Sequence, residues 1–393
     1  MRLSTNFFKL TALVAVTFLI SCRSEKNENV LPAISKQYGL MVDEAIKKNA
    51  LPRTVMSDGS VLWSNKKFEW TIGLFPGSCW YMYELTGDGN WKQYGQELQK
   101  ILSKYVDKSS HDLGFVFNCS YGNAFRLTND STYIVPMIQA ANTLAGRFDP
   151  KVGLIKSWDA DKGWQSQRGW QYPVIIDNMM NLELLFKVAS YTNDSTYYNI
   201  AVSHADNTMK NHYREDMSCY HVVDYDSITG AVRKKETAQG YSDNSSWARG
   251  QAWGLYGYTM CYRFTKDKRY LDFAQKIASY IMNEPSIPSD CIPYWDYDDP
   301  KIPNVPRDAS AASVTASALL ELSEYSSFGD EYKSYAEKII KSLKSSEYLA
   351  KVGTNNYFLL KHSVGSIPHG NEIDVPLNYA DYYFLEALVR SDK

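Results

Sequence analysis

The sequence predicts a predominantly α-helical fold, in which helical hairpins repeat within a single domain. Three observations predict it: a turn-like phrase recurs along the chain, apolar residues between its copies recur at helical spacing, and no Pro/Gly/Ser-rich linker interrupts residues 32–393. Repeated hairpins in one domain of this length form either a closed ring, an α/α toroid, or an open solenoid. In a closed ring the connecting loops would meet at one mouth, where we expect a binding site.

The N-terminal segment predicts export. Two basic residues flank the start, and an almost purely apolar run over residues 10–20 is too short for a permanent membrane-spanning helix. The run ends in Leu19-Ile20-Ser21-Cys22, the apolar–small–Cys pattern of a lipoprotein cleavage site. We therefore predict a signal peptide over residues 1–21, a lipid on Cys22 and a tether over residues 22–31. An ordinary secretory signal with a chance cysteine is the alternative.

This N-terminus predicts an exported lipoprotein on the periplasmic face or the surface of a Gram-negative bacterium, held at the membrane only by its lipid. The net charge of −2 argues against nucleic acid as a partner and against a broad electrostatic membrane patch. We expect a monomer or a weak dimer.

The cysteines and histidines predict no metal site and no cofactor. Five cysteines follow Cys22, and they are odd in number, widely spaced and without a CxxC pair, so neither a zinc site nor a disulfide scaffold is expected. The six histidines include no HExxH motif. The five cysteines are Cys79, Cys119, Cys219, Cys261 and Cys291.

The recurring phrase predicts the ends and starts of successive helices. Its third residue is a plausible helix end and its Asp a plausible N-cap for the next helix. Each copy is followed within a few residues by Tyr or Trp. The copies are Leu85-Thr86-Gly87-Asp88, Leu127-Thr128-Asn129-Asp130, Tyr191-Thr192-Asn193-Asp194, Phe264-Thr265-Lys266-Asp267 and the weaker Phe328-Gly329-Asp330.

The segments between these turns follow a helical period, and strand alternation is scarce. Apolar residues step by four in two such segments. The sequence also predicts a hairpin over residues 221–232, around Thr229-Gly230, and a short strand over residues 357–361. The stepping residues are Ile176, Met180, Leu184 and Val188 in one segment and Val314, Ala318 and Leu322 in the other.

Aromatic side chains make up 14% of the chain, with 30 Tyr and 10 Trp. Tyr and Trp combine an apolar face with a polar edge, which suits stacking on sugar rings, although the same residues also fill large helical cores. Composition by itself favours the core.

Two carboxylates lie in surroundings of low polarity. Asp112 is part of His111-Asp112-Leu113-Gly114-Phe115, and Asp177 opens a helix within the run IIDNMMN that begins at Ile175. A buried carboxylate is costly unless it is paired or used, and burial raises its pKa as a general acid requires. The alternative for both is a helix N-cap.

A third cluster suggests binding of a uronic acid. In the segment 239–253 a polar loop runs into a helix start where Arg249 and Trp253 lie one turn apart on one face. Arg can bind a carboxylate with two hydrogen bonds while Trp stacks on the ring that carries it. A structural Arg beside a core Trp is the alternative. A further aromatic-rich loop precedes a helix at residues 68–78.

Taken in order, these segments resemble the unsaturated glucuronyl hydrolases, glycoside hydrolase family 88. The resemblance covers nearly all of the chain after the N-terminal segment and rests on long motifs: HDLGF, IIDNMMN, SDNSSWARGQAW, the stretch that begins Trp70-Thr71 and the stretch Arg307-Asp308-Ala309-Ser310-Ala311-Ala312. It implies that residues 32–393 are one catalytic (α/α)6 barrel. It also implies a substrate, the non-reducing-end 4,5-unsaturated uronic acid of glycosaminoglycan oligosaccharides made by lyases, and a reaction that hydrates the C4=C5 bond.

Roles for individual residues follow from the resemblance. Asp177 matches the catalytic acid/base, and Asp112 matches a second essential carboxylate whose charge helps to keep Asp177 protonated. A longer spacing after Trp158 leads us to expect that loop 160–171, with Trp164 and Trp170, reshapes the subsite for the leaving sugar. The positions that match substrate contacts are His221, Gln239, Arg249, Trp253, Trp70 and, more weakly, Trp158.

One departure from the family concerns sulfate. Some members that favour sulfated substrates carry Ser-x-x-Ser-x-Lys near the C-terminus, whereas here Ser363 and Ser366 are followed by Pro368 at the Lys position. We expect both serines to donate hydrogen bonds to sulfate and His369 to replace part of the missing charge when protonated. The alternative is that the serines only cap a turn.

Three other functions fit parts of the sequence. The related family 105 shares the fold and the acid/base Asp but acts on unsaturated galacturonyl groups, and the HDLGF and SDNSSWARGQAW wording favours family 88. A noncatalytic glycan-binding lipoprotein would need the aromatic residues but neither Asp112 nor Asp177. An ordinary glycosidase on the same barrel would cleave saturated sugars.

Overall fold

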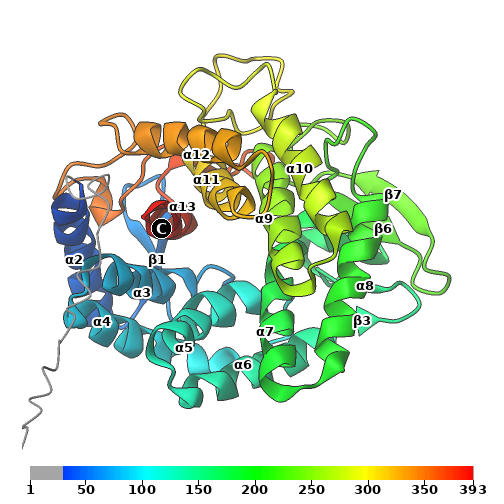
Figure 1. Ribbon diagram of the computed structural model, residues 1–393, viewed down its shortest axis with the longest axis horizontal. Helices are drawn as coiled ribbons and strands as arrows, with labels where there is room; N and C mark the ends of the chain where they lie inside the picture. Colours follow the sequence, from blue (N-terminus) through cyan, green and yellow to red (C-terminus); the bar gives the residue numbers. More distant parts are fainter. Residues whose placement is uncertain (1–29, 393) are drawn as a thin grey trace, which may run out of the picture.

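The computed structural model describes residues 30–392, which form a closed ring of helices (Figure 1). Within this range six outer helices alternate along the chain with six inner helical segments. The outer helices are α2 (Leu31–Lys48), α4 (Gly89–Gln99), α6 (Ile134–Ala145), α8 (Ser195–Asn211), α10 (Lys268–Met282) and α12 (Gly329–Leu343). The inner segments are α3 (Leu74–Thr86), the π-helix η2 (Gly114–Gly122) continued by α5 (Asn123–Thr128), α7 (Leu182–Thr192), α9 (Ala248–Thr265), α11 (Ala309–Ser323) and α13 (Asn378–Ser391). Because α13 contacts both α11 and α3, the ring closes, and the (α/α)6 barrel is confirmed.

Burial explains which helices lie inside. Every residue of α11 from Ala309 to Leu322 is buried, and most of them are small, so neighbouring helices can approach closely on all sides. The outer helix α10 instead buries one stripe of residues at helical spacing. That stripe consists of Tyr270, Ala274, Ile277, Ala278 and Ile281. All seven stepping residues are buried, as the predicted helical period requires, but Ile176 and Met180 lie in the 3-10 segment that precedes α7 rather than in α7 itself.

The recurring turn phrase ends an inner helix and starts the next outer one. In four copies the third residue has a left-handed backbone, with φ between 55° and 71°, and the Asp accepts a hydrogen bond of 2.8–3.0 Å from the backbone N–H two residues later. These four copies confirm the prediction. The fifth is wrong, because Phe328 precedes α12 and Asp330 lies inside its first turn without a capping bond.

The strands lie in the connections that lead from an outer helix to the next inner one. They form antiparallel pairs β1 (Leu51–Val55)–β2 (Val61–Ser64), β3 (Phe148–Asp149)–β4 (Leu154–Ile155) and β8 (Ser363–Ser366)–β9 (Asn371–Val375), and the sheet β5 (Tyr172–Ile175)–β6 (Val222–Tyr225)–β7 (Val232–Glu236). The predicted hairpin at 221–232 is confirmed by β6 and β7. The predicted strand at 357–361 is wrong, because residues 355–357 all have positive φ and the strand begins only at Ser363.

Charged residues close the barrel at the end opposite the strands. Arg263 pairs with Glu183 at 3.0 Å and with Glu321 at 3.2 Å, and Arg390 pairs with Glu321 at 2.8 Å. Burial opposes ionisation of Glu183, but Arg263 and Lys187 lower its pKa to about 2. We call these five residues the floor cluster. They line a cavity of about 240 Å³ and lie on four inner helices, α7, α9, α11 and α13, so the ring is tied together at this end.

The five cysteines Cys79, Cys119, Cys219, Cys261 and Cys291 are buried and unpaired. Within residues 30–392 no helix is long and apolar enough to cross a bilayer. The signal peptide, Cys22 and almost all of the tether lie outside the described residues and stay predictions.

Candidate active site

The predicted site residues gather at the strand-bearing end of the barrel because they lie on connections that run into inner helices. Five of the six connections contribute at least one of them. Trp70 precedes α3, Asp112 precedes η2, Trp158 and Asp177 precede α7, His221 and Gln239 precede α9, and Ser363 and Ser366 precede α13. The sixth connection contributes Asp308, discussed below.

Asp177 follows β5 directly, in the 3-10 segment η5 (Ile176–Asn181). The Ile176 N–H donates to His221 O at 3.1 Å, so this segment is anchored to the neighbouring strand. The Asp177 side chain is 15% exposed, and its Oδ2 lies 3.6 Å from His221 Nε2. Burial raises the pKa of Asp177 to about 7, with a further increase from the charge of Asp112 and an opposing effect of Arg249. Asp177 can therefore hold a proton near neutral pH.

Asp112 lies next to η5 because it precedes η2, and the start of η2 contacts η5 directly. Phe115 N–H donates to Asn181 Oδ1 at 2.9 Å, and a Cβ on Gly114 would lie only 2.8 Å from Asn181 O, so only glycine fits there. Burial raises the pKa of Asp112 to about 7, against the hydrogen bond from Ser110. Asp112 can therefore also hold a proton near neutral pH.

Neither carboxylate acts as a helix cap. The N-cap residues of η5 and η2 are Ile175 and Leu113, and neither segment has a side-chain capping hydrogen bond. The capping alternative raised by the sequence is therefore not supported for Asp112 or Asp177.

The ring of His221 is fixed by the backbone, with its Nε2 3.6 Å from Asp177 Oδ2. Its Nδ1 accepts from the backbone N–H of Ala238 at 3.0 Å and of Gln239 at 3.1 Å, which places the ring proton on Nε2. Burial and the nearby Arg249 lower the pKa of His221 well below its ordinary value, so the ring is neutral. Its Nε2–H faces Asp177 Oδ2.

An aromatic cavity of about 330 Å³ adjoins this acid/base region. Its aromatic walls are Trp70, Trp158, Trp164 and Tyr379, and its polar lining includes Gln239, Ser366, His369 and Asn371. The Trp158 ring lies 5.9 Å from His221, which connects the cavity to Asp177. Such a lining suits a sugar.

The predicted aromatic loop forms one side of this cavity. Trp158 stacks on Trp170 with ring centres 5.6 Å apart, and Trp164 lies 4.8 Å from the His369 ring. The loop therefore reaches the turn of the β8–β9 hairpin. Trp170 itself is buried and does not line the cavity, so of the two tryptophans in the predicted loop only Trp164 lines it, beside Trp158, which precedes the loop.

Arg249 is bound mainly by the protein rather than left open for a substrate carboxylate. It is 1% exposed, pairs with Asp308 at 2.9 Å, and donates to the carbonyls of Gly365 at 2.6 Å and Val364. It also lines the cavity. The expectation of a free guanidinium is corrected: the ring closure brings β8 onto Arg249, which the sequence could not show.

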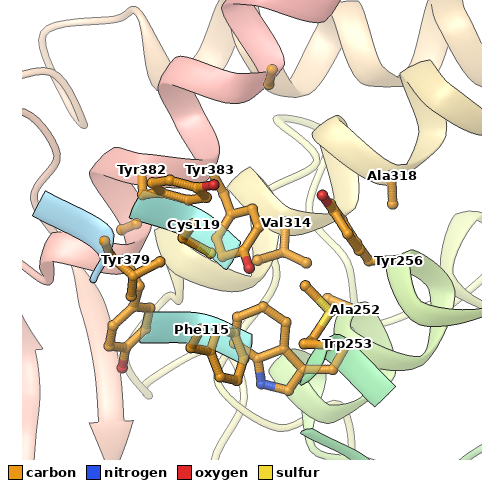
Figure 2. Packing of buried hydrophobic residues seen from close by; sticks show 14 of the residues in the cluster. Phe115, Cys119, Ala252, Trp253, Tyr256, Val314, Ala318, Tyr379, Tyr382 and Tyr383 are labelled. Atoms are coloured by element: carbon orange, nitrogen blue, oxygen red, sulfur yellow. The ribbon is translucent and has the colours of Figure 1, made fainter. Parts of the chain in front are cut away.

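Trp253 is wrong as a sugar-stacking residue. Its side chain is 0% exposed, and its ring packs between Phe115 at 5.3 Å and Tyr383 at 5.4 Å (Figure 2). Trp253 still contributes to lowering the pKa of Asp177. The alternative prediction, that Trp253 is a core residue, is the correct one.

The two serines of β8 have different positions. Ser366 lines the cavity, and its Oγ lies 2.7 Å from His369 Nδ1. Ser363 is 0% exposed and does not line the cavity, so its predicted contact with sulfate is wrong. Burial and Arg168 lower the pKa of His369, which therefore becomes charged only below its ordinary range.

Three residues that line the cavity lie outside every motif identified in the sequence: Arg53, Glu372 and Tyr379. Arg53 and Glu372 bind each other across 319 positions of sequence. Within residues 30–392 no group of three His, Cys, Asp or Glu side chains could hold a metal ion.

A closed helical barrel whose mouth carries two carboxyl groups beside an aromatic cavity defines a carbohydrate-active enzyme. The sequence profile of Glycosyl Hydrolase Family 88 matches residues 41–392. The chain belongs to this family of hydrolases.

The sequences of known relatives match this chain over most of its length. An unsaturated glucuronyl hydrolase from Formosa agariphila is 41% identical, with 97% of each chain covered. An unsaturated chondroitin disaccharide hydrolase from Streptococcus pneumoniae is 33% identical over 82% of this chain and 81% of the relative. A solved structure of an unsaturated glucuronyl hydrolase specific for heparin is 47% identical, with a TM-score of 0.87, over 93% of this chain and 97% of the other.

Proposed function

We propose that this enzyme removes the 4,5-unsaturated uronic acid from the non-reducing end of glycosaminoglycan oligosaccharides that polysaccharide lyases have produced. The observation that carries the proposal is the pair Asp112 and Asp177, whose pKa values are both raised to about 7 beside an aromatic cavity. A carboxyl group that holds its proton near neutral pH suits a reaction that needs an acid and then a base.

The chemistry assigned to Asp177 is proton transfer to carbon. Protonated Asp177 gives its proton to C4 of the C4=C5 bond, and the resulting carboxylate takes a proton from the water that attacks C5. The product is a hemiketal at C5, which opens to a keto acid and releases the neighbouring sugar. Asp177 regains its proton, so protons balance over the cycle.

His221 and Asp112 assist this step in different ways. Two backbone hydrogen bonds on Nδ1 hold the Nε2–H of His221 3.6 Å from Asp177 Oδ2, where it faces the carboxylate that forms when Asp177 gives up its proton. The negative charge of Asp112 raises the pKa of Asp177 and favours the protonated form before the reaction.

For the substrate, we propose that the heparin-derived disaccharide is preferred over the chondroitin-derived one. The solved structure that is 47% identical is described as specific for heparin, whereas the named chondroitin disaccharide hydrolase from Streptococcus pneumoniae is 33% identical.

The test measures the turnover of disaccharides made by heparin, chondroitin and hyaluronan lyases. The loss of the alkene absorbance reports the turnover. Asp177→Asn is the matched inactive control. A saturated disaccharide of the same sugars separates this reaction from ordinary glycoside hydrolysis, and turnover of the saturated sugar would overturn the proposal.

Unsaturated rhamnogalacturonan fragments distinguish family 105 activity. Faster turnover of these fragments than of every glycosaminoglycan disaccharide would also overturn the proposal, whereas family membership predicts the reverse.

We further propose that the enzyme is an exported lipoprotein, acylated on Cys22 and acting as a monomer or weak dimer. The support is the apolar run over residues 10–20 that ends in Leu19-Ile20-Ser21-Cys22.

A further inference from the structure

Arg53, on β1, binds two carboxylates at the edge of the cavity. Its Nε and Nη2 bind Glu372 at 2.6 and 3.0 Å, and its Nη1 binds Glu69 at 2.7 Å. The three side chains are 22%, 12% and 16% exposed, respectively. Two-point Arg–carboxylate pairs with little solvent access hold their geometry better than surface ion pairs.

Glu372 lies across the backbone of Gly365 on the paired strand. A Cβ on Gly365 would be 2.6 Å from Glu372 Cβ and closer still to its Oε2, so only glycine leaves room. Glu372 and Asp374 both have φ of 55°, a left-handed backbone that is unfavourable for residues other than glycine. The hairpin therefore depends on tertiary contacts, and the Arg53–Glu372 pair is one of them.

The carbonyl of Gly365 in turn holds two residues that match the family's substrate contacts. It accepts from Arg249 Nη2 at 2.6 Å and from Gln239 Nε2 at 3.2 Å. A shift of Gly365 would consequently move the side chains that line the cavity on its α9 side.

The second carboxylate connects Arg53 to the opposite wall. Glu69 Oε2 accepts from Thr71 Oγ1 at 2.5 Å and from Thr71 N–H at 3.1 Å, on either side of Trp70. Arg53 thus joins the Trp70 loop to the β8–β9 hairpin, and both contribute side chains to the lining of the cavity.

We propose that Arg53 is a positioning residue for substrate binding, which acts through Glu372 and Gly365 on Arg249 and Gln239. The inference rests on the proposed function for its kinetic consequence, and on the structure alone for its effect on the hairpin. Its contacts do not include Asp112, Asp177 or His221.

The expected kinetic result is a change in KM rather than in kcat. Arg53→Met should raise KM roughly tenfold or more, because truncating one partner of a well-enclosed charge pair leaves two facing carboxylates and loosens the walls. The kcat should stay within roughly threefold, because the acid/base residues keep their contacts. Gly365→Ala, which displaces Glu372 from the other side, should give the same pattern.

Arg126→Met is the matched control. Arg126 forms an equally close two-point pair with Glu84, at 2.9 and 2.6 Å, beside the floor cluster at the far end of the barrel. This variant should leave KM unchanged. If Arg53→Met does not fold, Arg53→Lys, which keeps the charge but loses the two-point bond, is judged by the same criteria.

Hydrogen exchange provides a readout that needs no activity. Amides of residues 363–375 should exchange faster in Arg53→Met than in the wild type, while those of α11 should not change. Unchanged exchange in 363–375, unchanged KM, a loss confined to kcat, or an equal rise of KM in Arg126→Met would each overturn the proposal. A wild type that turns over none of the disaccharides would instead refute the proposed function, and the exchange result would still decide the role of Arg53.

Discussion

The raised pKa of Asp177 makes the rate of the reaction depend on pH in a defined direction. The carboxyl must be protonated to donate to carbon, so activity is expected below its pKa of about 7 and is lost as pH rises through that value. Above it, kcat/KM should fall about tenfold per pH unit.

The magnitude follows from the size of the shift. At pH 6 a group with a pKa of about 7 is roughly 90% protonated, whereas an Asp with the ordinary value of 3.8 would be protonated to less than about 1%. The burial of Asp177 therefore increases the population of the active acid about a hundredfold at this pH. Asp177→Asn removes the proton altogether, and a loss of roughly 10²–10⁴-fold in kcat is expected, with substrate binding retained.

The assay is the initial rate of alkene loss between about pH 5 and about pH 9, in the wild type and in two variants. In Asp112→Asn the remaining activity should begin to fall at a lower pH than in the wild type, because the charge of Asp112 raises the pKa of Asp177. A wild-type rate that stays constant above pH 7, near-normal turnover by Asp177→Asn, or a fall that begins at a higher pH in Asp112→Asn would refute this account of the acid.

Three further predictions concern other parts of the chain. Ser366→Ala should change the ratio of kcat/KM for 6-sulfated and unsulfated disaccharides, whereas the buried Ser363→Ala should not, and equal effects of both variants would contradict this. Arg390→Met should lower the free energy of unfolding by about 3–5 kcal/mol, because it leaves buried Glu321 without one of its partners. The melting temperature should fall by roughly 4–7 °C, and calorimetry that finds no decrease would refute a stabilising floor cluster. Mass spectrometry of the protein from its native host should find diacylglycerol on Cys22, and an unlipidated chain that begins elsewhere would exclude the lipoprotein.

The local features of the fold could be read from consecutive residues. Asp88, Asp130, Asp194 and Asp267 cap the following segment because the cap and the N–H it binds are two residues apart, so no distant contact is needed. The copy at Phe328 was wrong because Gly329, the residue before Asp330, begins α12 and does not adopt the left-handed backbone found in the other four copies.

The site was predictable where its residues stand in long motifs. Asp112 and Asp177 were recognised within HDLGF and IIDNMMN, and the structure brings both to the mouth of the barrel with raised pKa values. The spacing of Arg249 and Trp253 correctly predicted one helix turn, but not that both side chains are buried, because this depends on what the closed ring packs against them.

By itself, then, the sequence determined the helices, their caps, the family and the two carboxylates, since each of these depends on neighbouring residues or on a contiguous motif. Only the tertiary structure decided that Ser366 faces the cavity while Ser363 does not, and that Arg53 meets Glu372 over 319 positions of chain. The physical reason is that closure of the ring, not local propensity, sets which distant side chains come into contact, how much water they lose, and therefore which of them can bind a substrate or hold a proton.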